Sequence, residues 1–357
     1  MKCLPRPIFD YLEGGAEDEI GLEHNRSVFS NIRLIPRRFR DVSERTCATT
    51  LWGDAFSAPI VVAPTGFNSL FWPKGDIALA RAAASEGVPF VLSTASNTSI
   101  EDLAQASDGD RWFQLYVLSR ELAKSLVRRS LDADYSTLVL TVDVIVNGNR
   151  ERDIRNDFSA SAKSCWRQLI WGLSKPAWAY RMLSGPAISL ANFTHPDDDP
   201  VSQAALISRT MDCSFDWDAF RWLRDLWPRR LLVKGVLHPH DAAKCIALGA
   251  DGVILSNHGG RQLDTAISPM GTLGQVATSI PDRVLIDSGF RRGSDIIKAI
   301  AMGANGVLIG RPVLYGLAVN GEQGAREVLR IFSRETTDTL CQLGCKSLSE
   351  VTPDLIC

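Results

Sequence analysis

Three residues suited to acid–base chemistry follow short apolar runs of the sequence. His258 and Arg261 lie in the segment SNHGGRQLD, which overlaps the end of the apolar run 252–256, and Asp143 follows the run 137–141. A histidine can accept a proton near neutral pH, and a carboxylate beside it can stabilise the imidazolium that forms. An arginine can hold a substrate carboxylate with two hydrogen bonds. We therefore expect a catalytic site that accepts a proton from an anionic substrate.

Structural roles for the same residues are the alternative. A single histidine usually makes hydrogen bonds that only support the fold, and Asp143 could cap a helix or lie in a solvated loop. Of the five histidines in the chain, only His258 lies at the end of an apolar run, which favours catalysis. Arg150, in the charged segment NGNRERDIR, is either a second ligand for the carboxylate or a solvated residue.

Cationic residues follow three further apolar runs. Lys234 ends LLVK, and a buried ammonium group there needs an anionic partner. It could form a Schiff base or stabilise an anionic cofactor. The turns SGFRRG (288–293) and GR (310–311) place glycines beside arginines, which suits the binding of phosphate oxygens. We expect a phosphorylated ligand, and two tight turns with solvated arginines are the alternative.

Short apolar runs carry these residues at their carboxyl ends. Continuous rather than alternating apolar residues are typical of parallel strands covered on both faces. Helical segments at 76–86, 121–130, 241–248 and 294–302 follow several of the runs. This alternation predicts a (β/α)8 TIM barrel, in which the carboxyl ends of the strands surround the active site and phosphate binds after strands seven and eight. The expected strands are Pro59–Ala63, Pro89–Ser93, Trp112–Tyr116, Thr137–Thr141, Leu231–Lys234, Gly252–Ser256, Arg283–Asp287 and Gly306–Gly310.

The composition restricts the class of protein. Hydrophobic residues make up 45% of the chain and charged residues 22%, which is typical of a globular protein. The net charge of −2 argues against a nucleic-acid partner. Eight cysteines without a CxxC pair indicate reduced thiols in a cytosolic setting. The N-terminus lacks the apolar segment of a secretory signal, and no apolar run is long enough to predict a spanning helix.

The fourth and fifth expected strands are unusually far apart. About 90 residues separate them, so we expect a long insertion in the fourth βα loop, on the catalytic face. We expect residues 1–357 to form a single barrel domain and residues 158–195 to be a membrane-interface insertion within it. The insertion has no acidic residue between Phe158 and His195, and it combines lysine and arginine with Trp166, Trp171 and Trp178. That composition suits a segment lying in a membrane interface, whereas packing on the barrel or an oligomer contact is the alternative.

Several segments together resemble a known family. SNHGGRQLD, LLVKG, PTG, FQLYV, LTVD and IDSGFRRG are similar to the FMN-dependent 2-hydroxy-acid dehydrogenases and oxidases, over nearly the whole chain from Asp10 onward. WPKGD, LSTASN, VNGNRERD and DLWPRRLLVKG resemble the branch of membrane-associated (S)-mandelate dehydrogenases. Relative to the family, the N-terminal helix is expected to be short, and Gly66 replaces an alanine found in many oxidases, which favours a dehydrogenase.

The resemblance implies a role for each polar residue at the strand ends. His258 would take the proton with Asp143 supporting it, Arg150 and Arg261 would bind the substrate carboxylate, and Tyr116 and Tyr11 would hydrogen-bond substrate oxygens. Lys234 would stabilise the reduced flavin of FMN. The remaining residues expected to bind the cofactor are Pro64, Thr65, Gly66, Ser93, Gln114, Thr141, Ser256, Asp287, Gly289, Arg291, Gly310 and Arg311.

We therefore expect FMN-dependent oxidation of an (S)-2-hydroxy acid, with (S)-mandelate as substrate and a membrane quinone as electron acceptor. A homo-tetramer, peripheral on the cytoplasmic side of the inner membrane, is expected from the resemblance together with the insertion. A soluble cytoplasmic protein is the alternative location. Lactate or another acid of the same family is the alternative substrate. A non-redox phosphate-binding barrel that uses Lys234 as a Schiff base is the alternative from a different class.

Overall fold

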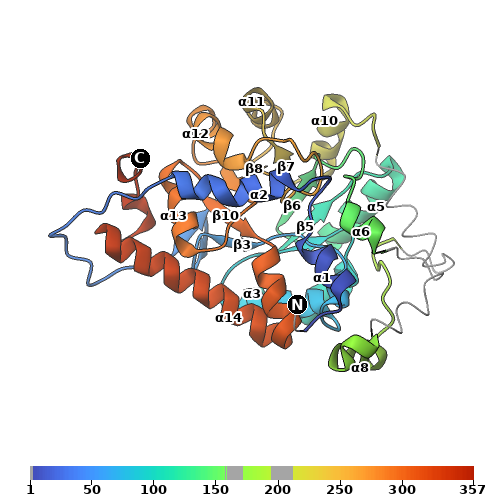
Figure 1. Ribbon diagram of the computed structural model, residues 1–357. Helices are drawn as coiled ribbons and strands as arrows, with labels where there is room; N and C mark the ends of the chain where they lie inside the picture. Colours follow the sequence, from blue (N-terminus) through green and yellow to red (C-terminus); the bar gives the residue numbers. More distant parts are fainter. Residues whose placement is uncertain (1–2, 157, 159–171, 194–211) are drawn as a thin grey trace.

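The centre of the molecule is a closed barrel of parallel strands, shown in the computed structural model of Figure 1. The structure describes residues 3–156, 158, 172–193 and 212–357. The strand order around the barrel, β10-β3-β4-β5-β6-β7-β8-β9, follows the chain and closes on itself. The predicted (β/α)8 barrel is therefore confirmed. The strands are β3 (Ile60–Val62), β4 (Phe90–Ser93), β5 (Arg111–Leu115), β6 (Thr137–Thr141), β7 (Arg230–Val236), β8 (Gly252–Leu255), β9 (Val284–Ile286) and β10 (Gly306–Ile309).

Side chains from alternate strand positions fill the barrel interior. One cluster of buried residues includes Trp112, Leu232 and Ile254 from three different strands. The same cluster contains Leu51 and Phe56 of a two-stranded antiparallel sheet, β1 (Thr49–Leu51) with β2 (Asp54–Phe56), which the sequence did not lead us to expect. This hairpin packs against the interior of the barrel and adds apolar burial there.

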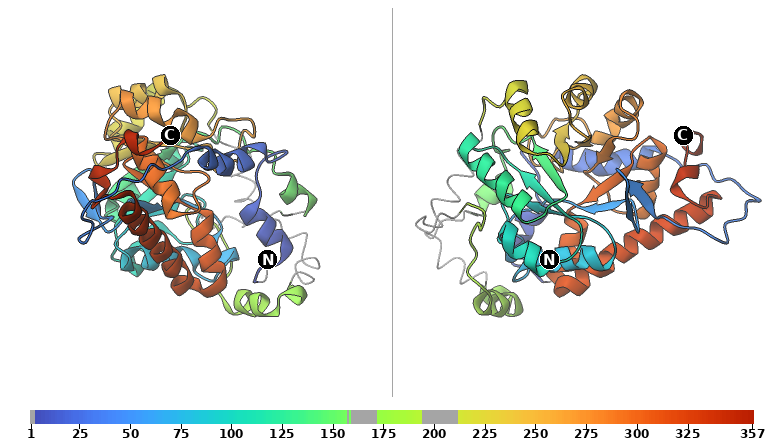
Figure 2. Two further views of the ribbon diagram at one scale, coloured as in Figure 1. Left: turned by 60° about the vertical axis from the view of Figure 1, so that its left-hand side comes forward. Right: turned by 180° about the vertical axis from the view of Figure 1, so that it is seen from behind.

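Amphipathic helices surround the strands, and several begin at side-chain caps. Ser99, Ser119 and Asp216 each accept a hydrogen bond from a backbone N–H in the first turn of the following helix, which satisfies donors that the helix leaves unpaired. Figure 2 shows the helices as an outer layer around the barrel. They are α3 (Gly75–Ser85), α4 (Ile100–Ala106), α5 (Arg120–Asp132), α10 (Trp217–Leu226), α11 (Pro239–Ala247), α12 (Pro269–Ser279), α13 (Gly293–Ala301) and α14 (Arg311–Leu343).

The N-terminal segment contacts the loops that follow the strands. Helix α1 (Arg6–Glu13) packs against the short helix α6 (Glu151–Arg155), and the side-chain amide of Asn156 donates to Asp10 at 2.9 Å. After α1, the backbone N–H of Ala16 donates to the carbonyl of Gly260 at 2.8 Å. Helix α2 (Ile20–Ser27) follows, and its first turn is held by Asp264. This segment therefore lies over the carboxyl ends of the strands, where it can contribute residues to a site.

The described part of the insertion is anchored to the barrel on one side and exposed on the other. In helix α8 (Pro176–Ser184), the Trp178 indole donates to the carbonyl of Leu70 at 2.8 Å. Leu173, Tyr180 and Leu183 are largely exposed, with relative accessibilities of 82%, 74% and 87%. Trp166 and Trp171 of the predicted interfacial segment lie outside the described residues. Among the helices that the structure describes, none has the length and apolar character needed to cross a membrane.

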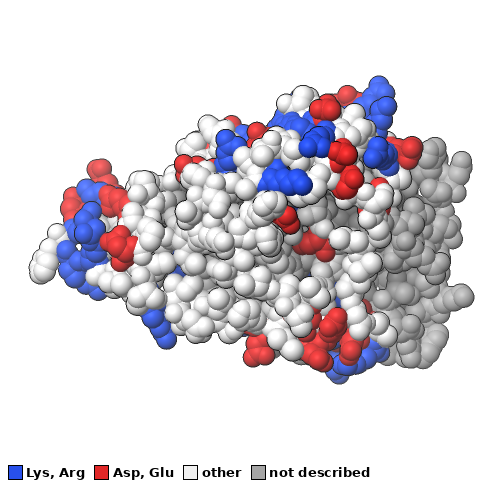
Figure 3. Space-filling view, turned by 90° about the horizontal axis from the view of Figure 1, so that it is seen from above, with Lys and Arg blue, Asp and Glu red and all other residues white. Residues whose placement is uncertain are grey.

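Charged residues of both signs are mixed on the surface. On the face seen in Figure 3, basic and acidic side chains lie in the same groups, with apolar and uncharged surface between them. This distribution matches the nearly balanced count of 39 basic and 41 acidic residues. All seven cysteines in the described ranges carry free thiols, and Cys165 lies outside those ranges.

Candidate active site

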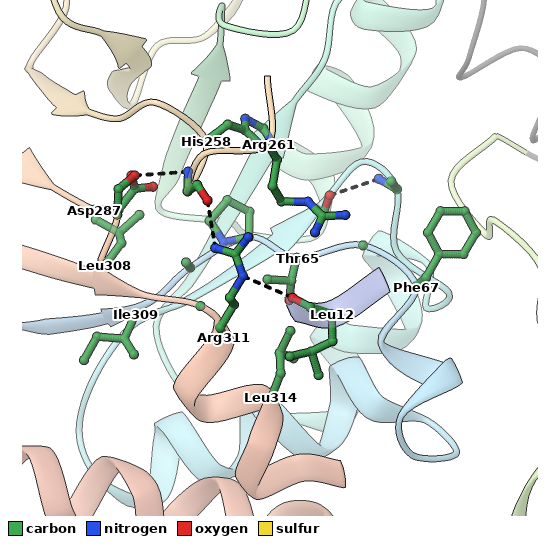
Figure 4. Close-up of a pocket in the computed structure, with 18 of the residues that line it drawn as sticks. Leu12, Thr65, Phe67, His258, Arg261, Asp287, Leu308, Ile309, Arg311 and Leu314 are labelled. Carbon is green, nitrogen blue, oxygen red and sulfur yellow. Dashed lines mark hydrogen bonds between the residues drawn. The ribbon is translucent and has the colours of Figure 1, made fainter. Parts of the chain in front are cut away.

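A cavity opens at the carboxyl ends of the strands. It brings together residues from both ends of the chain, and Figure 4 shows His258, Arg261 and Arg311 around it. Most of the residues predicted for the site line this cavity. They are Tyr11, Tyr116, Arg150, His258 and Arg261 of the expected catalytic set, and Pro64, Thr65, Gly66, Ser93, Lys234, Asp287, Gly289, Arg291, Gly310 and Arg311 of the expected cofactor-binding set.

Four predicted residues lie behind the cavity wall. Asp143 contacts the His258 ring, and Gln114 accepts a hydrogen bond from the Ser93 hydroxyl at 3.0 Å. Ser256 is fully buried, and its hydroxyl is bonded by the Lys234 ammonium group at 2.8 Å. Thr141 is also buried, at the end of β6. Asp143, Gln114 and Ser256 therefore act on the cavity through the wall residues that they contact.

The histidine–aspartate pair is formed. His258 Nδ1 lies 2.9 Å from Asp143 Oδ1, while Nε2 on the other side of the ring lies 3.4 Å from the Tyr116 hydroxyl. His258 has a φ of 58°, and Gly259 and Gly260 also have positive φ, so the SNHGGRQLD turn depends on left-handed backbone. This turn aims the imidazole at Asp143 from the end of β8.

Burial sets the protonation state of this pair. Burial lowers the pKa of His258 below its ordinary value, although Asp143 opposes the shift. Burial alone would raise the pKa of Asp143, but the charges of His258 and Lys234 outweigh it and the pKa is lowered. The resting pair therefore consists of a neutral imidazole and an ionised carboxylate. That combination can accept one proton at Nε2 and stabilise the resulting charge.

Buried arginines provide positive charge for an anion. Burial and the nearby Arg150 lower the pKa of Arg261 to about 9, and burial with Arg291 lowers the pKa of Arg311 to about 10. Arg261 donates to the carbonyls of Tyr11 and Gly14, each at 2.8 Å. The carbonyl oxygens accept hydrogen bonds from Arg261 but do not neutralise the charge of its guanidinium group. An anionic ligand would therefore reduce the repulsion between the buried arginines.

Arg311, which was expected to bind phosphate, is held in the same way. Arg311 donates to the carbonyls of Leu12 at 3.1 Å, Gly259 at 2.9 Å and Gly14 at 2.9 Å. The bond to Leu12 is visible in Figure 4. The Gly14 carbonyl accepts hydrogen bonds from both Arg261 and Arg311, so the residue that follows α1 contacts both arginines.

Lys234 carries a charge rather than a free amine. Burial lowers its pKa, but Asp287 at 3.0 Å and the nearby Asp143 outweigh this, and the pKa of Lys234 is raised. A Schiff-base lysine must lose its proton to attack a carbonyl carbon. The structure therefore favours the alternative in which Lys234 supplies a cation to an anionic ligand.

The cavity has the polar and spatial features that a flavin nucleotide needs. Gln114 Nε2 and Thr141 Oγ1 are buried without a hydrogen-bond partner among the described residues, so a bound group can satisfy them. At Gly289 a Cβ atom would lie 1.8 Å from the Asn25 carbonyl oxygen, so only glycine fits there. Gly66 lies against Ala95, where a Cβ atom would be 3.1 Å from the Ala95 Cβ. The two unpartnered polar atoms, together with the buried cations Lys234 and Arg311, therefore fit FMN, whereas the two glycines are required by packing within the chain.

Comparison with known proteins decides the family. The model of the FMN-dependent dehydrogenase family matches residues 1–357. The chain belongs to the FMN-dependent dehydrogenase family. It is 54% identical to the (S)-mandelate dehydrogenase of Pseudomonas putida, over all of this chain and 91% of that protein. It is 38% identical to an L-lactate oxidase of Nostoc sp., over 98% of this chain and 93% of that protein.

Solved structures agree with this family assignment. A crystal structure of the monotopic membrane protein (S)-mandelate dehydrogenase superposes with a TM-score of 0.95 at 54% identity, covering 100% of this chain and 96% of that one. A mandelate oxidase complex superposes with a TM-score of 0.83 at 34% identity, covering 98% and 94%. This member of the FMN-dependent dehydrogenase family is therefore an FMN-dependent enzyme that oxidises 2-hydroxy acids.

The apolar part of the cavity was not predicted from the sequence. Phe67 and Phe71 follow β3 and line the cavity, together with Leu308 and Leu314 near β10. Leu308 was part of an expected strand, but its apolar side chain gave no functional signal. Phe67 has a φ of 58°, a strained conformation for a bulky residue, and such strain clusters at functional sites.

Proposed function

We propose that this enzyme oxidises (S)-mandelate to the corresponding 2-oxo acid. The observation that carries the proposal is the His258–Asp143 pair in the same cavity as the buried Arg261. A base, its supporting carboxylate and a cation for the substrate carboxylate are what 2-hydroxy-acid oxidation needs from the protein. The 54% identity to an (S)-mandelate dehydrogenase supports the choice of substrate.

Aromatic side chains favour a substrate that carries a ring. The Tyr11 ring lies 6.1 Å from that of Phe67, 6.4 Å from that of Phe71 and 4.8 Å from that of Phe158. The Arg261 guanidinium lies 5.1 Å from the centre of the Tyr11 ring. The carboxylate-binding cation therefore sits beside an aromatic surface, which suits a phenyl group next to a carboxylate.

Each residue of the site then has a role in the reaction. Arg150 and Arg261 bind the substrate carboxylate, and Tyr116 and Tyr11 hydrogen-bond substrate oxygens. His258 Nε2 accepts a proton from the substrate as it is oxidised, and Asp143 stabilises the imidazolium. Bound FMN would supply the acceptor for the two electrons and for the second hydrogen that the substrate loses.

The cofactor-binding residues divide between the ring and the phosphate. Pro64, Thr65, Gly66, Ser93, Gln114 and Thr141 would hold the isoalloxazine, with Lys234 and Ser256 beside it. The ribityl chain and phosphate would lie at Asp287, Gly289, Arg291, Gly310 and Arg311. Charged Lys234 would stabilise negative charge on the reduced ring.

We further propose that the insertion binds a membrane surface and that a quinone in that membrane is the electron acceptor. The exposed Leu173, Tyr180 and Leu183 on one side of the insertion support this proposal. So does the likeness to a monotopic membrane protein. We place the enzyme on the cytoplasmic side of the inner membrane, as a homo-tetramer.

The membrane proposal can be tested with liposomes. Replacing Leu173, Tyr180 and Leu183 together by serine should reduce flotation with anionic vesicles by roughly tenfold or more, because three exposed apolar side chains no longer enter the interface. Val319→Ser, at a residue that is 62% exposed outside the insertion, is the matched control. Unchanged flotation of the triple variant would remove this part of the proposal.

The choice of substrate is tested by mixing the holoenzyme with acids under anaerobic conditions. We expect (S)-mandelate to bleach the flavin absorbance and (R)-mandelate to leave it unchanged. L-lactate should reduce the flavin more slowly at saturation, because it leaves the aromatic surface near Phe71 unfilled. Faster reduction by L-lactate would replace mandelate with lactate and leave the family unchanged.

A further inference from the structure

Asp76 is a fully buried carboxylate that contacts Asn68, and Asn68 in turn contacts Thr65 in the cavity wall. Asp76 is in the first turn of α3, and 0% of it is exposed. It does not line the cavity and has no place in the reaction described above. None of the ion pairs formed by the described residues includes it. A buried charge without a cationic partner is costly, so the hydrogen bonds around Asp76 must compensate for it.

Those hydrogen bonds come from two loops of the cavity wall. The Asn68 side-chain amide donates to Asp76 Oδ1 at 2.7 Å, and the backbone N–H of Asn97 donates to Oδ2 at 3.1 Å. Asn68 belongs to the loop between β3 and α3, whereas Asn97 belongs to the loop between β4 and α4. Burial raises the pKa of Asp76 to about 6, so the group is an ionised acceptor at neutral pH.

The carboxylate fixes which way the Asn68 amide faces. Asn68 Nδ2 donates both to Asp76 and to the carbonyl of Thr65, at 3.0 Å, so its oxygen must face the other way. That oxygen, Oδ1, accepts a hydrogen bond from the Thr65 hydroxyl at 2.9 Å. A hydroxyl has one proton to donate. Any further hydrogen bond of the Thr65 hydroxyl must therefore be one that it accepts.

We propose that Asp76 is a positioning residue for the flavin: through Asn68, it fixes the Thr65 hydroxyl as a hydrogen-bond acceptor. This inference rests on the proposed role of Thr65 in binding the isoalloxazine. Thr65 lines the cavity, whereas Asp76 acts on it only through Asn68.

Asp76 is also connected to the insertion, through Asn97. The Asn97 side chain accepts from the backbone N–H of Ser69 at 3.1 Å and donates to the carbonyl of Ser189 at 2.8 Å. Ser189 lies near the end of the described part of the insertion. Asp76 therefore anchors the point at which the two cavity loops and the insertion meet.

Asparagine at position 76 would have nearly the same volume but the wrong hydrogen-bonding capacity. Its side chain offers one oxygen and one NH2 group, yet it faces the donors Asn68 Nδ2 and the Asn97 N–H, with the Thr98 hydroxyl also within hydrogen-bonding reach. Either Asn97 loses its acceptor or the Asn68 amide turns over. If the Asn68 amide turns over, its NH2 group faces Thr65 and reverses the polarity of the hydroxyl.

The test measures the release of FMN from the holoenzyme. Asp76→Asn should release FMN roughly tenfold faster than the wild type, because the Thr65 hydroxyl is no longer fixed as an acceptor facing the flavin. The KM for (S)-mandelate should stay within about twofold, because the substrate-binding arginines are not in this network. Asp218→Asn is the matched control, because Asp218 occupies the same helix position in α10 but is exposed.

A double-mutant cycle separates positioning from a general loss of stability. In the background of Thr65→Val, which removes the hydroxyl, Asp76→Asn should change FMN release by less than about twofold. Should Asp76→Asn fail to fold, Asn68→Ala severs the same link while Asn97 still bonds the carboxylate, and it should also release FMN roughly tenfold faster.

The inference is overturned if folded Asp76→Asn, or folded Asn68→Ala, releases FMN as slowly as the wild type. It is equally overturned if the effects of Asp76→Asn and Thr65→Val are additive. Reduction of the wild-type flavin by (S)-mandelate in the same preparations reports separately on the proposed function.

Discussion

The electrostatic support that Asp143 gives to His258 can be measured by removing only its charge. Asp143→Asn keeps the shape of the side chain and an oxygen that can face Nδ1, which is 2.9 Å away in the wild type. The charges of the imidazolium and carboxylate would be centred about 4 Å apart. At an effective dielectric constant of about 20, their attraction is about 4 kcal/mol. If the variant lacks this attraction when the proton reaches His258, the rate of flavin reduction falls by a factor of about 10³.

The assay is anaerobic stopped-flow reduction of the bound FMN by saturating (S)-mandelate. Asp143→Asn should lower the limiting rate by about two to three orders of magnitude with little change in substrate affinity, because the arginines that bind the carboxylate are untouched. Asp241→Asn, in the exposed His240–Asp241 pair, is the control and should react as the wild type does. A limiting rate for Asp143→Asn within tenfold of the wild type would refute the reasoning.

Three further predictions follow from the same geometry. Arg261→Lys should raise the KM for (S)-mandelate by roughly 10²-fold or more in steady-state assays, since lysine cannot form the paired hydrogen bonds of arginine; an unchanged KM would exclude a carboxylate-binding role. The kcat/KM of the wild type should fall with decreasing pH only below about 6.5, because burial lowers the pKa of His258 and only the neutral ring accepts a proton. The pH profile of Asp143→Asn should move to still lower pH, and a shift to higher pH would contradict the assignment. Gly289→Ala should lower the free energy of unfolding in urea by at least about 2 kcal/mol, because Gly289 has a φ of 91° and a Cβ atom there would lie 1.8 Å from the Asn25 carbonyl oxygen. An unchanged free energy of unfolding would contradict this prediction.

The barrel could be predicted from sequence because its strands are buried on both faces. Runs such as 138–140 and 306–309 are continuously apolar, and helical segments separate the runs at the spacing of a βα unit. The β1–β2 hairpin was missed because TTLWGDAF is short and interrupted by a glycine and an aspartate, which resembles a turn. Its burial depends on contacts with the barrel interior, and local sequence does not contain them.

The polar part of the site could be predicted for a related reason. Polar residues at the ends of apolar strands stand out, and the barrel topology places those ends together. Phe67 and Phe71 did not stand out, because aromatic residues after a strand usually belong to the core. Asp76 was hidden as well: an aspartate in the first turn of a helix is ordinarily a solvated residue that favours the helix dipole, and only the folded chain buries it behind Thr65.

The central claim is that His258 accepts the proton when the substrate is oxidised. The most direct measurement is the anaerobic absorbance of holoenzyme His258→Ala after addition of (S)-mandelate, beside the wild type. The account predicts that both proteins bind FMN and that only the wild type bleaches within seconds. Flavin reduction in His258→Ala at a rate close to that of the wild type would contradict the account.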